Sequence, residues 1–84
     1  MTKNNENQIV PLFSTKDYNT ASLLYAAGQT LDSTNWENGA CYFIFADKDR
    51  CEAIMADYYN GKVKLNAKAI FDAQKTIKGI IYSR

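Results

Sequence analysis

The longest unbroken apolar run in the chain covers residues 40–46, with the sequence ACYFIFA. Seven residues are enough for a strand and too few for a typical helix, and Tyr, Phe and Ile favour strands. Alternate side chains of a strand point to opposite faces. One face would then carry Cys41, Phe43 and Phe45, and the other Tyr42 and Ile44. Because neither face has a polar residue, we expect both to be covered, by helices or by a second subunit.

The first half of the chain predicts two further strands and one helix. Residues 9–13 form a short apolar segment in which Pro11 cannot donate to a ladder, so we expect an edge strand. The capping pattern at 14–17 predicts a helix over 16–27 that Gly28 ends. A second strand is predicted over 29–33, followed by a turn over 34–39 that contains Trp36.

The second half predicts two helices. Asp47 is a suitable N-cap for a helix that extends to about Asn60, and its apolar stripe is Cys51, Ile54, Met55 and Tyr58. Gly61 ends this helix, and residues 62–65 form an extended connection. Asn66 caps the last helix, 67–82, whose apolar stripe includes Ile70, Ala73, Ile77 and Ile80 or Ile81.

The resulting order β-α-β-β-α-α predicts an α+β fold in which a small three-stranded sheet packs with three helices. A right-handed parallel first crossover places the third strand between the other two, in the sheet order 2-3-1. We expect residues 1–8 to be a flexible polar tail and residues 9–84 to form a single domain. Because three strands and three helices cover two sheet faces poorly, a homodimer is also expected.

Composition argues against catalysis. The chain of 84 residues contains no His, and its two cysteines do not have metal-site spacing. Capping explains the Asp47 and Asp49 carboxylates, and burial on an apolar stripe explains Cys51. We therefore expect a non-enzymatic protein with no cofactor and no metal. The lack of a run of transmembrane length or a signal-peptide pattern predicts a cytoplasmic protein with no membrane partner.

Charge and aromatic residues concentrate in the last third. Residues 58–84 contain Lys and Arg with Asp72 as the only acidic residue, although the net charge of the whole chain is only +1. We predict a binding surface that consists of Tyr59, Lys62, Lys64, Lys68, Phe71, Lys75, Lys78, Tyr82 and Trp36. For Trp36 two interpretations stay open, a lid folded over the core or an exposed ring that stacks on a partner.

Several segments resemble a known family. They are residues 13–17 (FSTKD) with Ala21 and Leu24, residues 41–45 (CYFIF), residues 58–61 (YYNG), and residues 71–73 (FDA) with Lys78 and Tyr82. The chain beyond its tail resembles a family of short bacterial and phage proteins that is classed only as a domain of unknown function. The resemblance implies a small α+β domain found among mobile-element genes. It implies no activity and no catalytic residue.

These observations favour a small non-catalytic binding module, encoded by a phage or another mobile element. The expected partner is a host protein or a small ligand that contacts the aromatic and basic surface. A nucleic acid is the alternative partner, because lysines neutralise phosphates and tyrosines stack on bases. The near-neutral charge of the chain weighs against that alternative.

Overall fold

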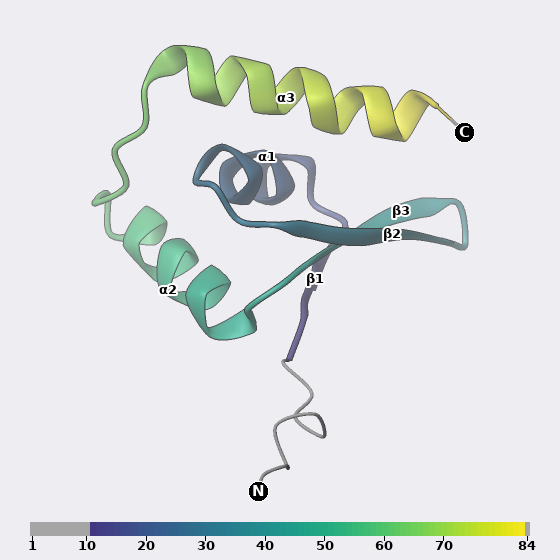
Figure 1. Ribbon diagram of the computed structural model, residues 1–84, viewed down its shortest axis with the longest axis horizontal. Helices are drawn as coiled ribbons and strands as arrows, with labels where there is room; N and C mark the ends of the chain where they lie inside the picture. The colour runs from purple at the N-terminus through teal and green to yellow at the C-terminus, as the bar shows by residue number, and fades with distance from the viewer. Residues whose placement is uncertain (1–10, 84) are drawn as a thin grey trace, which may run out of the picture.

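The computed structural model describes residues 11–83 and confirms the α+β fold. The elements are β1 (Phe13–Thr15), α1 (Tyr18–Ala26), β2 (Leu31–Glu37), β3 (Ala40–Phe45), α2 (Lys48–Tyr59) and α3 (Ala67–Tyr82) (Figure 1). Their order is the predicted β-α-β-β-α-α. The predicted tail over 1–8, the start of the first predicted strand at residues 9 and 10, and Arg84 lie outside the described residues.

β3 is the central strand of a three-stranded sheet with the order β1-β3-β2, as predicted. It pairs antiparallel with both neighbours, so β1 and β2 run parallel to each other. Phe45 lies opposite Phe13 on one side and Leu31 on the other. Side chains of directly opposed residues share a face and interact, so these three apolar residues form one row across the sheet.

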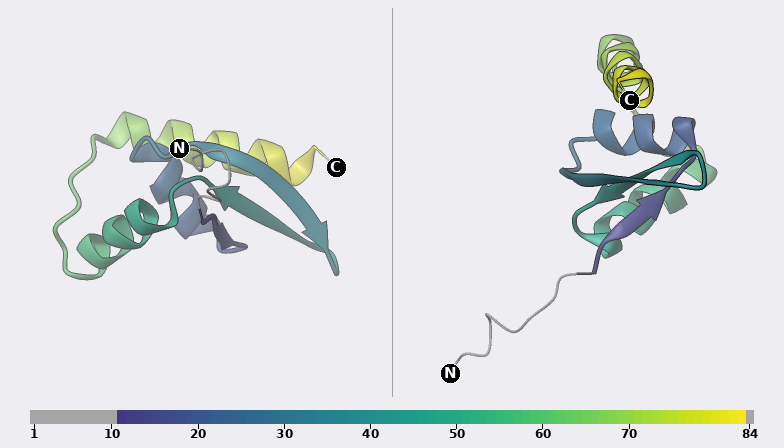
Figure 2. Two further views of the ribbon diagram at one scale, coloured as in Figure 1. Left: turned by 60° about the horizontal axis from the view of Figure 1, so that its bottom comes forward. Right: turned by 90° about the vertical axis from the view of Figure 1, so that its right-hand side faces the viewer.

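The core lies on one face of this sheet. Cys41, Phe43 and Phe45 are buried, and the two phenylalanines have no exposed surface. The helices contribute the buried residues Ala21, Leu24, Cys51, Met55 and Ile77 to the same cluster. Figure 2 shows the layers that result, with α1 next to the sheet and α3 outside α1.

The opposite face of β3 is less covered. Tyr42 and Ile44 are half-buried and do not belong to the core cluster. Their neighbours on the same face include the exposed Ser33 and Asn35 of β2. All three helices contribute buried residues to the one core cluster, which includes neither Tyr42 nor Ile44. A second subunit on this face stays a prediction.

The strand boundaries differ from the sequence prediction at two places. The first strand begins at Phe13 rather than at residue 9, and Pro11 instead accepts a hydrogen bond from the backbone N–H of Lys48 at 3.0 Å. The second strand extends through Glu37, so the predicted turn over 34–39 is wrong. The turn is the two-residue pair Asn38-Gly39, and both residues have positive φ, as a type I′ hairpin requires.

The helices follow their predicted caps with one exception. The capping pattern at 14–17 predicts Ser14 as the N-cap of the first helix. The N-cap of α1 is instead Asp17, whose carboxylate accepts a hydrogen bond from the Thr20 N–H at 2.8 Å. Asp47 and Asn66 cap α2 and α3 as predicted. Within residues 11–83, no helix is both long and apolar enough to span a membrane.

Candidate functional site

One face of α3 carries exposed aromatic rings and lysines in a continuous row. The row consists of Phe71, Lys75, Lys78 and Tyr82. Their spacing of i, i+4, i+7 and i+11 places them on one side of the helix. The row, named here the α3 stripe, is about 16 Å long at 1.5 Å per residue. Phe71 is 60% exposed and Tyr82 77% exposed. The opposite side of α3 is buried through Ala73 and Ile77, so the fold itself directs the stripe outward.

A shallow depression of about 270 Å³ lies beside the stripe. Its lining residues are Tyr18, Phe71, Gln74, Lys75 and Lys78. The Tyr18 hydroxyl donates to the backbone carbonyl of Gln74 at 3.3 Å, which joins α1 to α3 at this position. Two aromatic rings and two ammonium groups therefore surround one concave patch.

Lys68 is less available to a binding partner than its exposed position suggests, because it forms an ion pair within α3. Its Nζ lies 2.6 Å from the Asp72 carboxylate one turn away. This hydrogen bond raises the pKa of Lys68 and lowers the pKa of Asp72, which the Lys75 charge lowers further. Lys75 and Lys78 have no ion pair with any described residue, so they are the cations that the stripe can offer.

The remaining predicted residues are spread over other parts of the molecule. Lys62 and Lys64 are exposed on the segment between α2 and α3. Trp36 is half-buried and packs against the core from β2, which agrees with the lid interpretation and not with an exposed stacking ring. Tyr59 is 76% exposed on α2 and lines a different cavity from the one beside the stripe.

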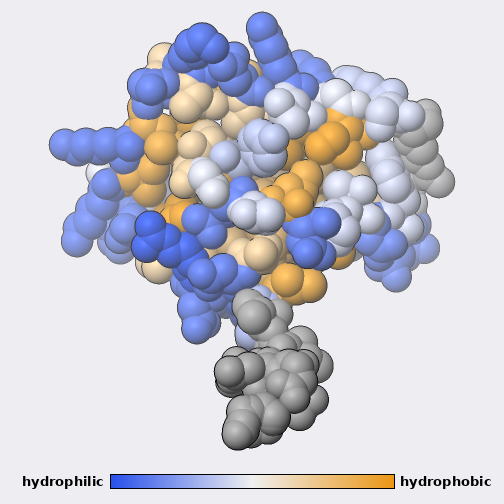
Figure 3. Space-filling model, viewed as in Figure 1, coloured by the Kyte–Doolittle hydropathy of each residue, from blue (hydrophilic) through white to orange (hydrophobic). Residues whose placement is uncertain are grey.

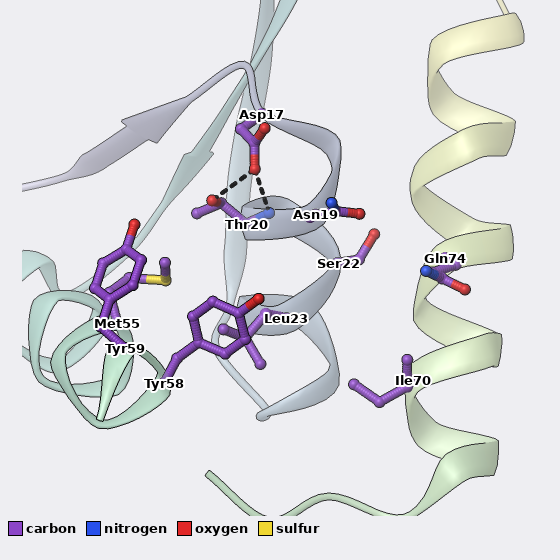
Figure 4. Close-up of a pocket in the computed structure, with 10 residues that line it drawn as sticks. All are labelled: Asp17, Asn19, Thr20, Ser22, Leu23, Met55, Tyr58, Tyr59, Ile70 and Gln74. Carbon is purple, nitrogen blue, oxygen red and sulfur yellow. Dashed lines mark hydrogen bonds between the residues drawn. The ribbon is translucent and has the colours of Figure 1, made fainter. Parts of the chain in front are cut away.

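That second cavity is a cleft of about 340 Å³ between α1, α2 and α3 (Figure 4). Its lining residues are Asp17, Asn19, Thr20, Ser22, Leu23, Met55, Tyr58, Tyr59, Ile70 and Gln74. Of these, sequence reasoning had selected only Tyr59 as a site residue. The signal that could have found the cleft is Ser22, a polar residue in the middle of the apolar sequence ASLL of α1.

Asp17, the N-cap residue of α1, adds a negative charge to the lining of the cleft. One carboxylate oxygen accepts both the backbone N–H and the hydroxyl of Thr20, each at 2.8 Å. These hydrogen bonds lower the pKa of Asp17 below its usual value, so the group is ionised at neutral pH. Among residues 11–83, no lysine or arginine lines the cleft to balance this charge.

Both cysteines are buried, and Cys51 lies in the core with no exposed surface. Burial raises the pKa of the Cys51 thiol, and the charges of Asp47 and Glu52 raise it further. Its Sγ donates to the Ala46 carbonyl at 3.6 Å. The thiol is therefore protonated and inaccessible, and it serves as packing rather than as a nucleophile. Among residues 11–83 there is also no cluster of three groups able to hold a metal ion.

The fold and these surfaces define a small α+β domain with exposed aromatic and basic side chains on its outer helix. Figure 3 shows hydrophilic side chains that project along the edge where α3 lies. The chain belongs to the family described as Domain of unknown function (DUF5659), whose model matches residues 11–83. No curated protein and no solved structure matches the chain significantly.

The lowered pKa of Asp17 predicts a pH-dependent contribution to stability. A carboxylate with a depressed pKa in the folded state stabilises the fold above its unfolded pKa, and this stabilisation is lost as pH falls through the folded value. Asp17→Asn retains a capping oxygen but does not titrate. We expect it to lower the free energy of unfolding at neutral pH, and to match the original chain only once pH falls below the folded-state pKa of Asp17, which lies below 3.8.

Urea unfolding at neutral pH and in acid measures the difference in the free energy of unfolding between Asp17→Asn and the original chain. Asp57→Asn is the matched control, since it removes the same charge from an exposed position on α2. A stability gap for Asp17→Asn that persists unchanged into acid would contradict the capping role of the carboxylate.

Proposed function

We propose that this protein is a non-catalytic binding module whose α3 stripe docks on an acidic and partly apolar surface of another protein. The observation that carries the proposal is the exposure of Phe71 and Tyr82 at the two ends of a row that contains Lys75 and Lys78. Large exposed aromatic side chains are typical anchors of protein interfaces, and charged neighbours at the rim fix orientation.

The shape of the stripe favours a protein partner over a small ligand. A row about 16 Å long on one helix face fits the mode in which a helix lies in a groove. The depression beside the row is shallow, and its concave patch is formed by side chains from two helices. An acidic side chain of the partner could enter this patch and approach both Lys75 and Lys78 while its apolar neighbours contact Phe71.

Nucleic-acid binding is the second candidate, since the same lysines and aromatic rings suit phosphates and bases. Its support is weaker because Lys68 is paired with Asp72 and Lys62 and Lys64 lie outside the stripe. Few available cations imply a small electrostatic contribution, and the sequence pI of about 7.7 is low for a dedicated nucleic-acid binder.

The biological setting is part of the same proposal. We propose that the chain is encoded by a phage or another mobile element of a bacterium and acts on a host protein in the cytoplasm. The small size of the domain agrees with action by binding alone.

Self-association is proposed for the other side of the molecule. Ala40, Tyr42 and Ile44 of β3 are only half-buried, and they form the apolar centre of the sheet face that the core does not use. A homodimer that covers this face would remove these side chains from water and would leave the α3 stripe free for the partner.

Site-specific photo-cross-linking in cells that express the chain tests the docking surface. With benzoylphenylalanine in place of Phe71, we expect one dominant protein adduct, because an anchor ring lies in the partner's surface. Adding Lys75→Glu and Lys78→Glu should reduce the adduct at least about tenfold, since two reversed charges would face acidic groups of the partner.

The matched control is Lys48→Glu with Arg50→Glu, which makes the same charge change on exposed residues of α2 and should retain the adduct. Benzoylphenylalanine at Tyr25, an exposed ring of α1 outside the stripe, should give no such adduct. Equal adducts from both charge variants would sink the proposal. Adducts only with nucleic acid would favour the second candidate.

A further inference from the structure

The interhelical cleft contains a buried hydroxyl without a partner. Ser22 is 3% exposed, and its Oγ makes no hydrogen bond with any described group. A helical serine commonly donates to the carbonyl one turn earlier, and this serine does not. In Figure 4 the hydroxyl lies on the side of α1 that faces α3 and points toward the side chain of Asn19. Such a group lowers the stability of the fold, and it offers one donor and one acceptor to a molecule that enters the cleft.

The walls of the cleft restrict the ligand's shape. A volume of about 340 Å³ is at the low end for small-molecule sites. Tyr58 and Tyr59 lie next to each other on α2, with ring centroids 5.5 Å apart and planes tilted by 59°. Figure 4 shows the Tyr58 ring beside Leu23 at the side of the cleft opposite α3. One flat ring system can therefore stack against a tyrosine face, with Leu23 and Met55 as the apolar floor.

The polar groups restrict its chemistry. The side-chain amides of Asn19 and Gln74 each offer both a donor and an acceptor, and the Ser22 hydroxyl adds one more of each. These groups complement a ring edge that alternates donors and acceptors. The ionised Asp17 carboxylate, with no cation in the lining, repels a phosphate.

We propose that the interhelical cleft binds a nucleobase, as the free base or the nucleoside and not as the nucleotide. The base stacks on Tyr58, and its polar edge reaches the Ser22 hydroxyl once the flexible ends of Asn19 and Gln74 move aside. This site is separate from the α3 stripe and does not rest on the protein-binding function, since only Gln74 lines both cavities.

The test uses the full chain and NMR titration with adenosine, guanosine, cytidine and uridine, each compared with its 5′-monophosphate. We expect at least one nucleoside to shift the amide signals of Ser22, Tyr58 and Gln74 in a saturable way at millimolar concentration or below. Its monophosphate should bind more weakly, and Asp17→Asn should narrow that difference because the repelling charge is gone.

Ser22→Ala separates a ligand-binding role from a structural one. Loss of the hydroxyl should weaken nucleoside binding roughly three- to tenfold, as expected for one hydrogen bond. The same change should raise the melting temperature, by up to about 4–8 °C, because an unsatisfied buried group is removed. Ser33→Ala, at an exposed serine of β2, is the control and should change neither quantity.

Any of three binding results would overturn the proposal: no nucleoside shifts these signals, a monophosphate binds more tightly than its nucleoside, or Ser22→Ala binds as tightly as the original chain. A lower melting temperature for Ser22→Ala would show that the hydroxyl has a partner in the fold, and it would overturn the proposal as well.

Discussion

The burial of Phe43 and Phe45 on one face of β3 is the interaction on which the rest of the structure depends. Both side chains are fully removed from water, and each contributes about 1.5–3 kcal/mol of hydrophobic free energy. The two phenylalanines join the three strands, because Phe45 lies opposite Phe13 and Leu31 and Phe43 lies opposite Thr15 and Thr34. They also fix the position of α1, whose Ala21 and Leu24 complete the same core.

This one-sided core determines which surfaces are left for function. α1 takes the place next to the sheet, so α3 becomes an outer layer that is held mainly by Ala73 and Ile77 (Figure 2). A helix with one narrow buried side exposes most of its circumference, and here the exposed side contains Phe71 and Tyr82. The three helices do not close over one another completely, and the cleft that contains Ser22 is the space between them.

The sequence predicted the central strand, the strand order and the caps of α2 and α3, because apolar runs and capping residues are local signals. The extent of β2 was missed because Asp32, Ser33 and Asn35 are exposed polar residues that give the strand no apolar pattern. The Asn38-Gly39 pair is a strong hairpin signal that would have corrected the turn. A corrected turn would also have predicted the position of Trp36. The residue lies opposite the buried Cys41 in the ladder, so its ring is on the core face of the sheet.

The candidate sites were predictable to different degrees. The α3 stripe follows from helical spacing alone, and so Phe71, Lys75, Lys78 and Tyr82 were identified together. The pairing of Lys68 with Asp72 was also visible at i, i+4 spacing. The shape of the cleft was not predictable, because it depends on the angles at which α1, α2 and α3 meet. Only its buried serine left a trace in the sequence.

We propose that the aromatic rings of the α3 stripe are not needed for folding and are therefore available to a partner. Urea unfolding of the double variant Phe71→Ala and Tyr82→Ala, beside Phe43→Ala, measures this most directly. We expect the double variant to stay within about 0.5 kcal/mol of the original chain, whereas Phe43→Ala should lose about 3–5 kcal/mol. A loss of about 2 kcal/mol or more in the double variant would show instead that the two rings are part of the core.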